Sequence, residues 1–135
     1  MLVADTSAWV EYLRRTESPA HHALRAAVAR DEVVLPEPVK AELLVGARSS
    51  AEFRDLQRML DGLPVALVHP RDDFDAAVDV YRRCRAVGIT PRGLVDCLLA
   101  AMVLRSDHSL LHSDRDLTSI ASVMGIPVAA GSLAG

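Results

Sequence analysis

The amino-acid sequence predicts an α/β fold, a three-layer α/β/α sandwich around a parallel sheet of about five strands. Short apolar runs alternate with segments of helical periodicity along the 135-residue chain, which is typical of strands joined by helical crossovers. Half of the residues are hydrophobic and 24% are charged, as in globular proteins. No repeat, linker or low-complexity segment interrupts the pattern, so we expect residues 1–135 to form one domain.

Five short apolar runs are the expected strands. Each of the first four precedes a helical segment, and the last contains a proline, which places it at an edge of the sheet. Parallel sheets of this kind present their ligand site beyond the carboxyl ends of the strands. The strands are expected at residues 2–4, 32–35, 65–68, 110–112 and 126–128.

Seven helices are expected, and several are bounded by residues that favour helix ends. Thr6 or Ser7 can cap the first helix, Ser18 and Pro19 open the second, and Gly88 ends the fifth. The first helix begins at residue 6 or 7, and the others span residues 19–30, 38–47, 50–61, 71–87, 94–105 and 114–124.

Two of these helices predict how the core is built. The helix at 94–105 is apolar nearly all round, so we expect it to be central and buried. The helix at 71–87 should bury one face. The residues that recur on that face at helical spacing are Phe74, Val78, Tyr81 and Cys84.

Cysteine usage and the absence of targeting patterns indicate a cytoplasmic protein. No apolar run reaches the roughly 18 residues that a membrane span requires, and no signal-peptide pattern opens the chain. We therefore expect no membrane association, and we expect Cys84 and Cys97 to be buried, reduced thiols.

The charge balance bears on the choice of partner. The net charge is −3, from 18 acidic and 15 basic residues, whereas nucleic-acid-binding domains are usually basic. If the five carboxylates discussed below belong to a metal site, 13 acids face 15 bases and the balance becomes +2. All the bases except Lys40 are arginines, whose planar guanidinium suits contact with phosphate.

Asp5 and Glu42 are acids in unusual surroundings. Asp5 directly follows the first strand, where a ligand site is expected, although it can equally serve as a helix cap. Glu42 lies between Val39 and Val45 on one helical stripe, which is costly unless the carboxylate is paired or bound to a metal. The alternative is that Glu42 points outward beside Lys40.

Three further acids follow the same logic. Asp96 is the only charged residue between Arg92 and Arg105, and a carboxylate in so apolar a helix needs a cation, either a metal or an arginine such as Arg92. Asp114 and Asp116 follow a strand and begin a helix, as the first acid of the chain does. Acids at a helix N-terminus also commonly compensate the helix dipole.

One pocket can collect all five acids, because they follow strands or lie on apolar helices. Packed carboxylates repel one another at neutral pH, and a hard divalent cation relieves that repulsion. Mg²⁺ or Mn²⁺ prefers oxygen ligands and makes a bound water a better nucleophile for in-line displacement at phosphorus. The pattern therefore predicts metal-dependent hydrolysis of a phosphodiester.

Four segments resemble those of PIN-domain ribonucleases, and specifically the VapC toxins of bacterial VapBC toxin–antitoxin pairs. The resemblance extends over nearly the whole chain, and the acid-bearing segments occur in family order. The segments are MLVADTSAWVEYL, LPEPVKAELLVGA, GLVDCLLAAMVL and LLHSDRDLTSIASVMGIPV.

This resemblance implies a site, an activity and partners. Thr6 or Ser7 would position the first carboxylate or its water. The chain would be a homodimer that cleaves RNA, of the tRNA or rRNA class, and would be restrained by a cognate VapB-like antitoxin. The acids that would bind Mg²⁺ or Mn²⁺ are Asp5, Glu42, Asp96 and Asp114, with Asp116 as a fifth acid of the site.

The last motif departs from the family pattern. Family members often read Thr-x-Asp-x-Asp-Phe where this chain has His112 in place of the threonine and Leu117 in place of the phenylalanine. Loss of the threonine removes a hydroxyl that would orient Asp114, whereas the change to leucine is expected to alter packing only. His112 is a possible phosphate contact, although a histidine at a strand end is more often structural.

Other function classes fit the sequence less well. A catalytically silent PIN-like protein that only binds its antitoxin is disfavoured because every acid of the site is present. Residues 114–118 also fit the DxDxT motif of haloacid-dehalogenase-like phosphatases, but only 17 residues follow Thr118 to supply the other motifs. His21 and His22 lack zinc spacing, so we expect them at the surface.

The RNA target is not encoded in any recognisable motif. Specificity is expected from loop shape and from arginines that contact phosphates. The candidate RNA contacts are Arg14, Arg15, Arg82, Arg83, Arg85 and Arg92.

Overall fold

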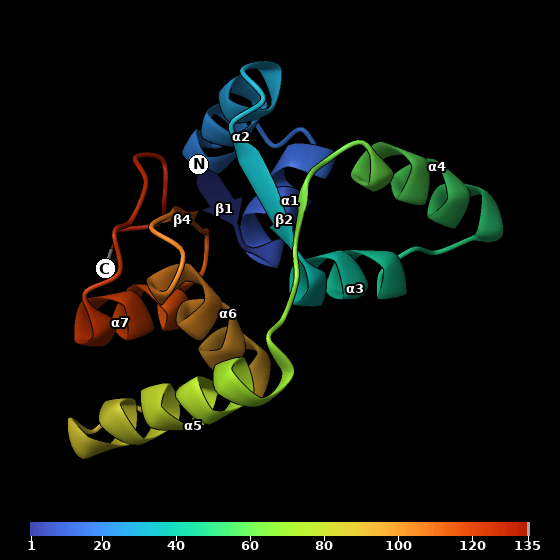
Figure 1. The fold of residues 1–135 in the computed structure, drawn as a ribbon. Coiled ribbons are helices and arrows are strands. Elements are labelled where there is room, and N and C mark those ends of the chain that lie inside the picture. The colour runs from blue at the N-terminus through green and yellow to red at the C-terminus, as the bar shows by residue number, and fades with distance from the viewer. Residues whose placement is uncertain (135) are drawn as a thin grey trace.

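A computed structural model describes residues 1–134 of the chain. At its centre lies a sheet with strand order β3-β2-β1-β4, in which every pair of neighbouring strands is parallel (Figure 1). The α/β prediction is therefore confirmed. The strands are β1 (Leu2–Ala4), β2 (Val33–Pro36), β3 (Val65–Ala66) and β4 (Ser109–Leu111).

Helices connect the strands, and their bounds lie within a few residues of the expected ones. Figure 1 shows α5, α6 and α7 gathered at the lower left, while α3 and α4 lie on the right. The helices are α1 (Thr6–Leu13), α2 (Pro19–Ala29), α3 (Glu37–Val45), α4 (Ser50–Asp61), α5 (Pro70–Ala86), α6 (Leu94–Leu104) and α7 (Arg115–Met124).

The fifth expected strand is reduced to a single bridge. Val128 pairs in parallel with Leu110 of β4, which puts it at the edge of the sheet. Leu110 donates its N–H to the carbonyl of Pro127 and accepts from the N–H of Ala129, both at 2.8 Å. The carbonyl of Pro127 therefore accepts a hydrogen bond, whereas its nitrogen has no N–H to donate, as expected for a proline in an edge strand.

The middle of α6 is the centre of the core. All residues from 97 to 103 are buried, whereas Leu94 and Val95 in the first turn are 50% and 40% exposed. Both cysteines are buried and unpaired, as expected. Because buried apolar side chains resist movement, α6 is a rigid support for the exposed first turn that carries Asp96.

Helix α5 buries a different face from the predicted one. Phe74 and Val78 are 45% and 52% exposed, so the prediction was wrong for these two residues. Cys84 is buried as expected, and the other buried positions are Ala77, Val80 and Asp73. The helix therefore turns a carboxylate inward and two large apolar side chains outward.

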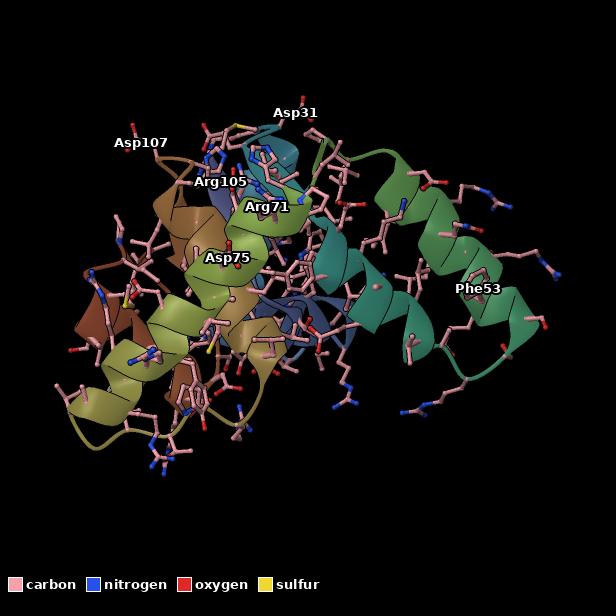
Figure 2. All side chains as sticks on the ribbon, turned by 60° about the horizontal axis from the view of Figure 1, so that its bottom comes forward. Asp31, Phe53, Arg71, Asp75, Arg105 and Asp107 are labelled. Carbon is pink, nitrogen blue, oxygen red and sulfur yellow. The ribbon has the colours of Figure 1, made fainter. Side chains whose placement is uncertain are left out.

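An ion pair explains why Asp73 is tolerated in the core. Arg105, just after α6, donates from Nε to Oδ1 at 2.7 Å and from Nη2 to Oδ2 at 2.9 Å, and the N–H of His69 also donates to Oδ2 at 2.7 Å. Arg105 lowers the pKa of Asp73 although burial opposes this. Figure 2 labels Arg71 at the start of α5 and Arg105 after the end of α6. The pair thus clamps α5 to the end of α6.

None of the helices within residues 1–134 combines the length and apolar character needed to cross a bilayer.

Candidate active site

Asp5 sits at the junction of β1 and α1, and its carboxylate is held by Ser7. Oδ2 of Asp5 accepts from the N–H of Ser7 at 3.0 Å and from its hydroxyl at 2.8 Å. Asp5 is therefore the N-cap of α1, and the predicted caps, Thr6 and Ser7, were wrong. Only 5% of Asp5 is exposed, so its orientation is fixed by the fold.

Ser7 also joins the first strand to the last. Its hydroxyl oxygen accepts from the N–H of Ser113, at 2.9 Å, while the hydroxyl proton goes to Asp5. Ser113 follows β4, which pairs with β1 in the sheet. This one side chain therefore fixes the relative position of two acid-bearing loops, those of Asp5 and Asp114.

Glu42 reaches the site from α3. The hydroxyl of Thr6 donates to its Oε1 at 2.7 Å, so Thr6 orients Glu42 in the same way that Ser7 orients Asp5. Glu42 is exposed, and Val45 is 85% exposed, so the expected apolar stripe does not exist on this side of α3. The sequence argument for Glu42 was wrong in its reason, although the residue lies beside the other acids.

Asp96 lies in the first turn of α6, where it is half-buried. Burial of the carboxyl, followed by the negative charges of Asp5, Asp114 and Asp116, raises its pKa to about 7, against a smaller opposing effect of Arg92. The Asp96 carboxyl, which would lose its proton near pH 4 in water, therefore keeps it up to nearly neutral pH. Part of the cause is the convergence of acids that the sequence predicted.

Asp114 and Asp116 are engaged by Arg92. Asp114 caps α7, and its Oδ1 accepts from the N–H of Asp116 at 2.7 Å. Nη2 of Arg92 donates to Oδ2 of Asp114, and its backbone N–H donates to Oδ2 of Asp116 at 3.0 Å. Arg92 therefore pairs with these two acids and not with Asp96, the partner that the sequence suggested.

A single open cavity collects the acids from four segments. Asp116 is not among the residues that line it but faces an adjoining hollow, which also holds Arg92, Asp114 and Arg115. The predicted residues that line the acidic cavity are Asp5, Thr6, Ser7, Glu42, Arg92, Asp96 and Asp114.

The donor set of this cavity fits a hard divalent cation. Its anionic groups are carboxylates, and no histidine or cysteine of the described chain lines it, so the chemistry suits Mg²⁺ or Mn²⁺ better than zinc. No three of these acids have ligand atoms within 4.8 Å of one another in residues 1–134. That spacing suits a cation that keeps several waters and contacts some carboxylates through them.

Three other residues have ligand atoms within 4.8 Å of one another, but these residues already take part in hydrogen bonds. Glu17, His21 and His22 lie at the start of α2, and His21 is buried, contrary to the expected surface position. Nδ1 of His21 accepts from the N–H of Glu17 at 3.0 Å, and Nδ1 of His22 lies 3.3 Å from Arg25. We infer that this cluster stabilises the loop between α1 and α2.

His112 is structural. It is fully buried, its Nδ1 accepts from the N–H of Asp114 at 3.3 Å, and burial lowers its pKa. The suggested phosphate contact was therefore wrong, because the residue has no exposed surface with which to touch a phosphate. Leu117, the other departure from the family motif, is also fully buried, in agreement with a packing role.

The candidate arginines are scattered. Arg14 lines a groove beside Glu42, and Arg92 lines the acidic cavity, whereas Arg15 faces a hollow with Glu17 and His21. The remaining three, Arg82, Arg83 and Arg85, lie on α5, where Arg83 pairs with Asp79.

Sequence reasoning missed two arginines close to the acids. Arg48 lines the same groove as Arg14, and Arg115 lies in the hollow beside Asp116. The position of Arg115 between Asp114 and Asp116 was a signal for the second, but nothing local marks Arg48, which follows α3.

The chain matches a known protein family over most of its length. Residues 2–123 match the model of the PIN domain. The chain is also 37% identical over 131 residues to the VapC ribonuclease Mb1587 of Mycobacterium bovis and to Ribonuclease VapC11 of Mycobacterium tuberculosis, covering 96% of this chain and 98% of each relative. This chain belongs to the PIN-domain family, in its VapC branch.

Solved structures of other proteins share the fold. FitAcB from Neisseria gonorrhoeae matches with a TM-score of 0.72 and 18% identity, over 95% of this chain and 96% of that one. The DNA-bound VapBC of Salmonella typhimurium matches with a TM-score of 0.66 and 16% identity, over 95% of this chain and 96% of that one.

Proposed function

We propose that this VapC-family protein is a Mg²⁺- or Mn²⁺-dependent endoribonuclease, the toxin of a type II toxin–antitoxin pair, which hydrolyses RNA phosphodiester bonds. The observation that carries the proposal is the convergence of Asp5, Glu42, Asp96 and Asp114 on one open cavity. There, burial and the neighbouring negative charges raise the pKa of Asp96 to about 7. Two curated relatives named as VapC ribonucleases support the substrate class.

The residues of the site divide the work of hydrolysis between them. When bound, a dication would neutralise the acids and polarise a water for in-line attack on phosphorus. Ser7 occupies Oδ2 of Asp5 with two hydrogen bonds, which leaves Oδ1 for a cation or its water. Thr6 orients Glu42, and the rigid α6 holds Asp96 opposite them. We assign Asp116 a supporting role, because it lies beside the cavity rather than in it.

We propose that a single RNA strand passes through the cavity, with arginines on both sides of the cleaved bond. The groove with Arg14 and Arg48 shares Thr6 and Glu42 with the acidic cavity. On the other side the hollow with Arg115 shares Arg92 and Asp114 with it. Arginines at both ends supply the positive charge that an acidic site lacks for a polyanion.

A cleavage assay tests the proposal. Purified protein is incubated with a tRNA and rRNA mixture in Mg²⁺, in Mn²⁺ or in EDTA, beside the variants Asp96→Asn and Asp75→Asn. We expect cleavage with either metal, none in EDTA, at least a hundredfold loss in Asp96→Asn, and wild-type activity in Asp75→Asn, since Asp75 is an exposed residue of α5 (Figure 2).

Three outcomes would overturn the proposal, the last of them in a parallel assay with small phosphate monoesters. Cleavage that persists in EDTA would exclude the metal. Absence of RNA cleavage under all conditions would favour a catalytically silent antitoxin-binding protein, and release of phosphate from small monoesters would favour a DxDxT phosphatase.

The proposed partners follow from the family. VapBC and FitAB structures among the structural neighbours support a VapB-like antitoxin, and we expect both proteins in the cytoplasm, where the RNA is. We also propose a homodimer, because Phe74 and Val78 expose apolar surface on α5 that a second copy would cover. Light scattering after size exclusion should give twice the monomer mass, and a monomer at micromolar concentration would contradict it.

A further inference from the structure

Arg92 is the only basic side chain that lines the acidic cavity within the described residues. Its guanidinium Nη2 donates to Oδ2 of Asp114, and its Nε lies 3.7 Å from Oδ2 of Asp116. Within residues 1–134 no ion pair involves the other three acids of the cavity. The one internal cation of the site is therefore committed to Asp114 and Asp116.

Both carboxylate oxygens of Asp114 therefore already have a hydrogen-bond donor. Oδ1 accepts from the N–H of Asp116, and Oδ2 accepts from Arg92. Asp5, by contrast, keeps Oδ1 without a donor among the described residues. A dication that uses Asp114 must consequently compete with the guanidinium of Arg92, whereas it meets no competitor at Asp5.

Arg92 is also placed so that it can move away. Its side chain is 66% exposed, and it belongs to the segment between α5 and α6 rather than to either helix. Exposed ion pairs are weak because water solvates both partners almost as well. A dication a few ångströms away would repel the guanidinium, so release of Arg92 toward solvent is the less costly arrangement.

We infer that Arg92 is a displaceable internal counterion, which neutralises Asp114 and Asp116 without metal and must leave Asp114 when Mg²⁺ or Mn²⁺ binds. This inference rests on the proposed function. It makes Arg92 a residue that sets metal affinity, and it gives the freed guanidinium a place beside the scissile phosphate.

The direction of the expected effect separates this role from a merely structural one. A residue that only supports the site would weaken metal binding when replaced. Removal of a competing positive charge near the cation should instead tighten binding, by roughly tenfold for charges about 6 Å apart in water. Replacement by glutamine keeps the backbone N–H bond to Asp116 and removes the charge together with the guanidinium bond to Asp114.

Titration calorimetry with MnCl₂, without RNA, tests the inference on the wild-type protein, Arg92→Gln and Arg115→Gln. Arg115→Gln removes the same charge from the neighbouring hollow, where Arg115 forms no ion pair in the described chain. We expect Arg92→Gln to bind Mn²⁺ roughly tenfold more tightly and Arg115→Gln to change by less than threefold. Arg92→Met serves as a second neutral variant should Arg92→Gln fail to fold.

Unchanged or weaker Mn²⁺ binding by the neutral variants would overturn the inference, as would an equal gain in Arg115→Gln. Failure of the wild-type protein to bind Mn²⁺ would instead refute the proposed metal dependence. The two failures are therefore distinguishable in one set of titrations.

Discussion

Replacement of Asp96 by asparagine should stabilise the metal-free protein at alkaline pH. The folded protein holds the Asp96 proton up to a pKa of about 7, whereas the unfolded chain releases it near its ordinary pKa of 3.8. The stability that protonated Asp96 contributes is therefore fully present below pH 3.8 and is lost as the pH rises through 7. Asparagine carries no charge at any pH, so the variant avoids that loss.

The size of the effect follows from the pKa difference. Between 3.8 and about 7 the difference corresponds to an upper bound of about 4 kcal/mol at high pH. Asp96 is only half-buried, and solvent screens part of the repulsion, so we expect a gain of about 1–3 kcal/mol. The gain should develop between pH 4.5 and 8.5.

Urea unfolding in EDTA across that pH range measures the gain. Asp75→Asn is the matched control, because it removes an exposed carboxylate from α5 and should show the pH profile of the wild-type protein. Parallel pH profiles for Asp96→Asn and the wild-type protein would refute the claim that repulsion and burial dominate at Asp96. A loss of stability in Asp96→Asn at pH 8.5 would refute it more strongly.

Three further changes test other parts of the structure. Asp73→Asn should lower the free energy of unfolding in urea by about 3 kcal/mol at pH 7, because it leaves Arg105 without its partner. Since folding lowers the pKa of Asp73, this loss of stability should shrink as the pH falls below 3.8. A loss that stays constant with pH would argue against the ion pair. Ser7→Ala should lower RNA cleavage at least tenfold, because Asp5 loses a hydrogen bond that orients it, and should cost about 2 kcal/mol of stability, because the N–H of Ser113 loses its acceptor as well; wild-type activity would contradict that role. Leu99→Ala should cost about 3 kcal/mol by opening a cavity in the buried part of α6, and a cost below 1 kcal/mol would show that α6 is not central.

The acids at strand ends were the part of the site that sequence could predict. Asp5 and Asp114 each follow a short apolar run, and parallel pairing of β1 with β4 brings their loops together. Asp96 was recognisable because no other charge interrupts the apolar helix around it. In each case a local pattern and the topology of parallel sheets were enough to place the residue.

Long-range contacts were beyond the reach of the local pattern. Two helical faces of α5 were compatible with its sequence, and the one that is buried includes Asp73, whose partner Arg105 lies 32 residues away. The pairing of Arg92 with Asp114 likewise spans 22 residues of sequence. Glu42 lies at the site although the apolar stripe predicted around it does not exist. Its carboxylate is oriented by a hydrogen bond from Thr6 of another helix, which the local sequence does not reveal.

Mn²⁺ located by anomalous diffraction in crystals of the wild-type protein would test most directly whether the acids of the four segments share a cation. We predict a peak in the acidic cavity, in direct or water-bridged contact with Asp5, Glu42, Asp96 and Asp114. No peak there at saturating Mn²⁺, or a peak only at Glu17, His21 and His22, would contradict the proposed active site.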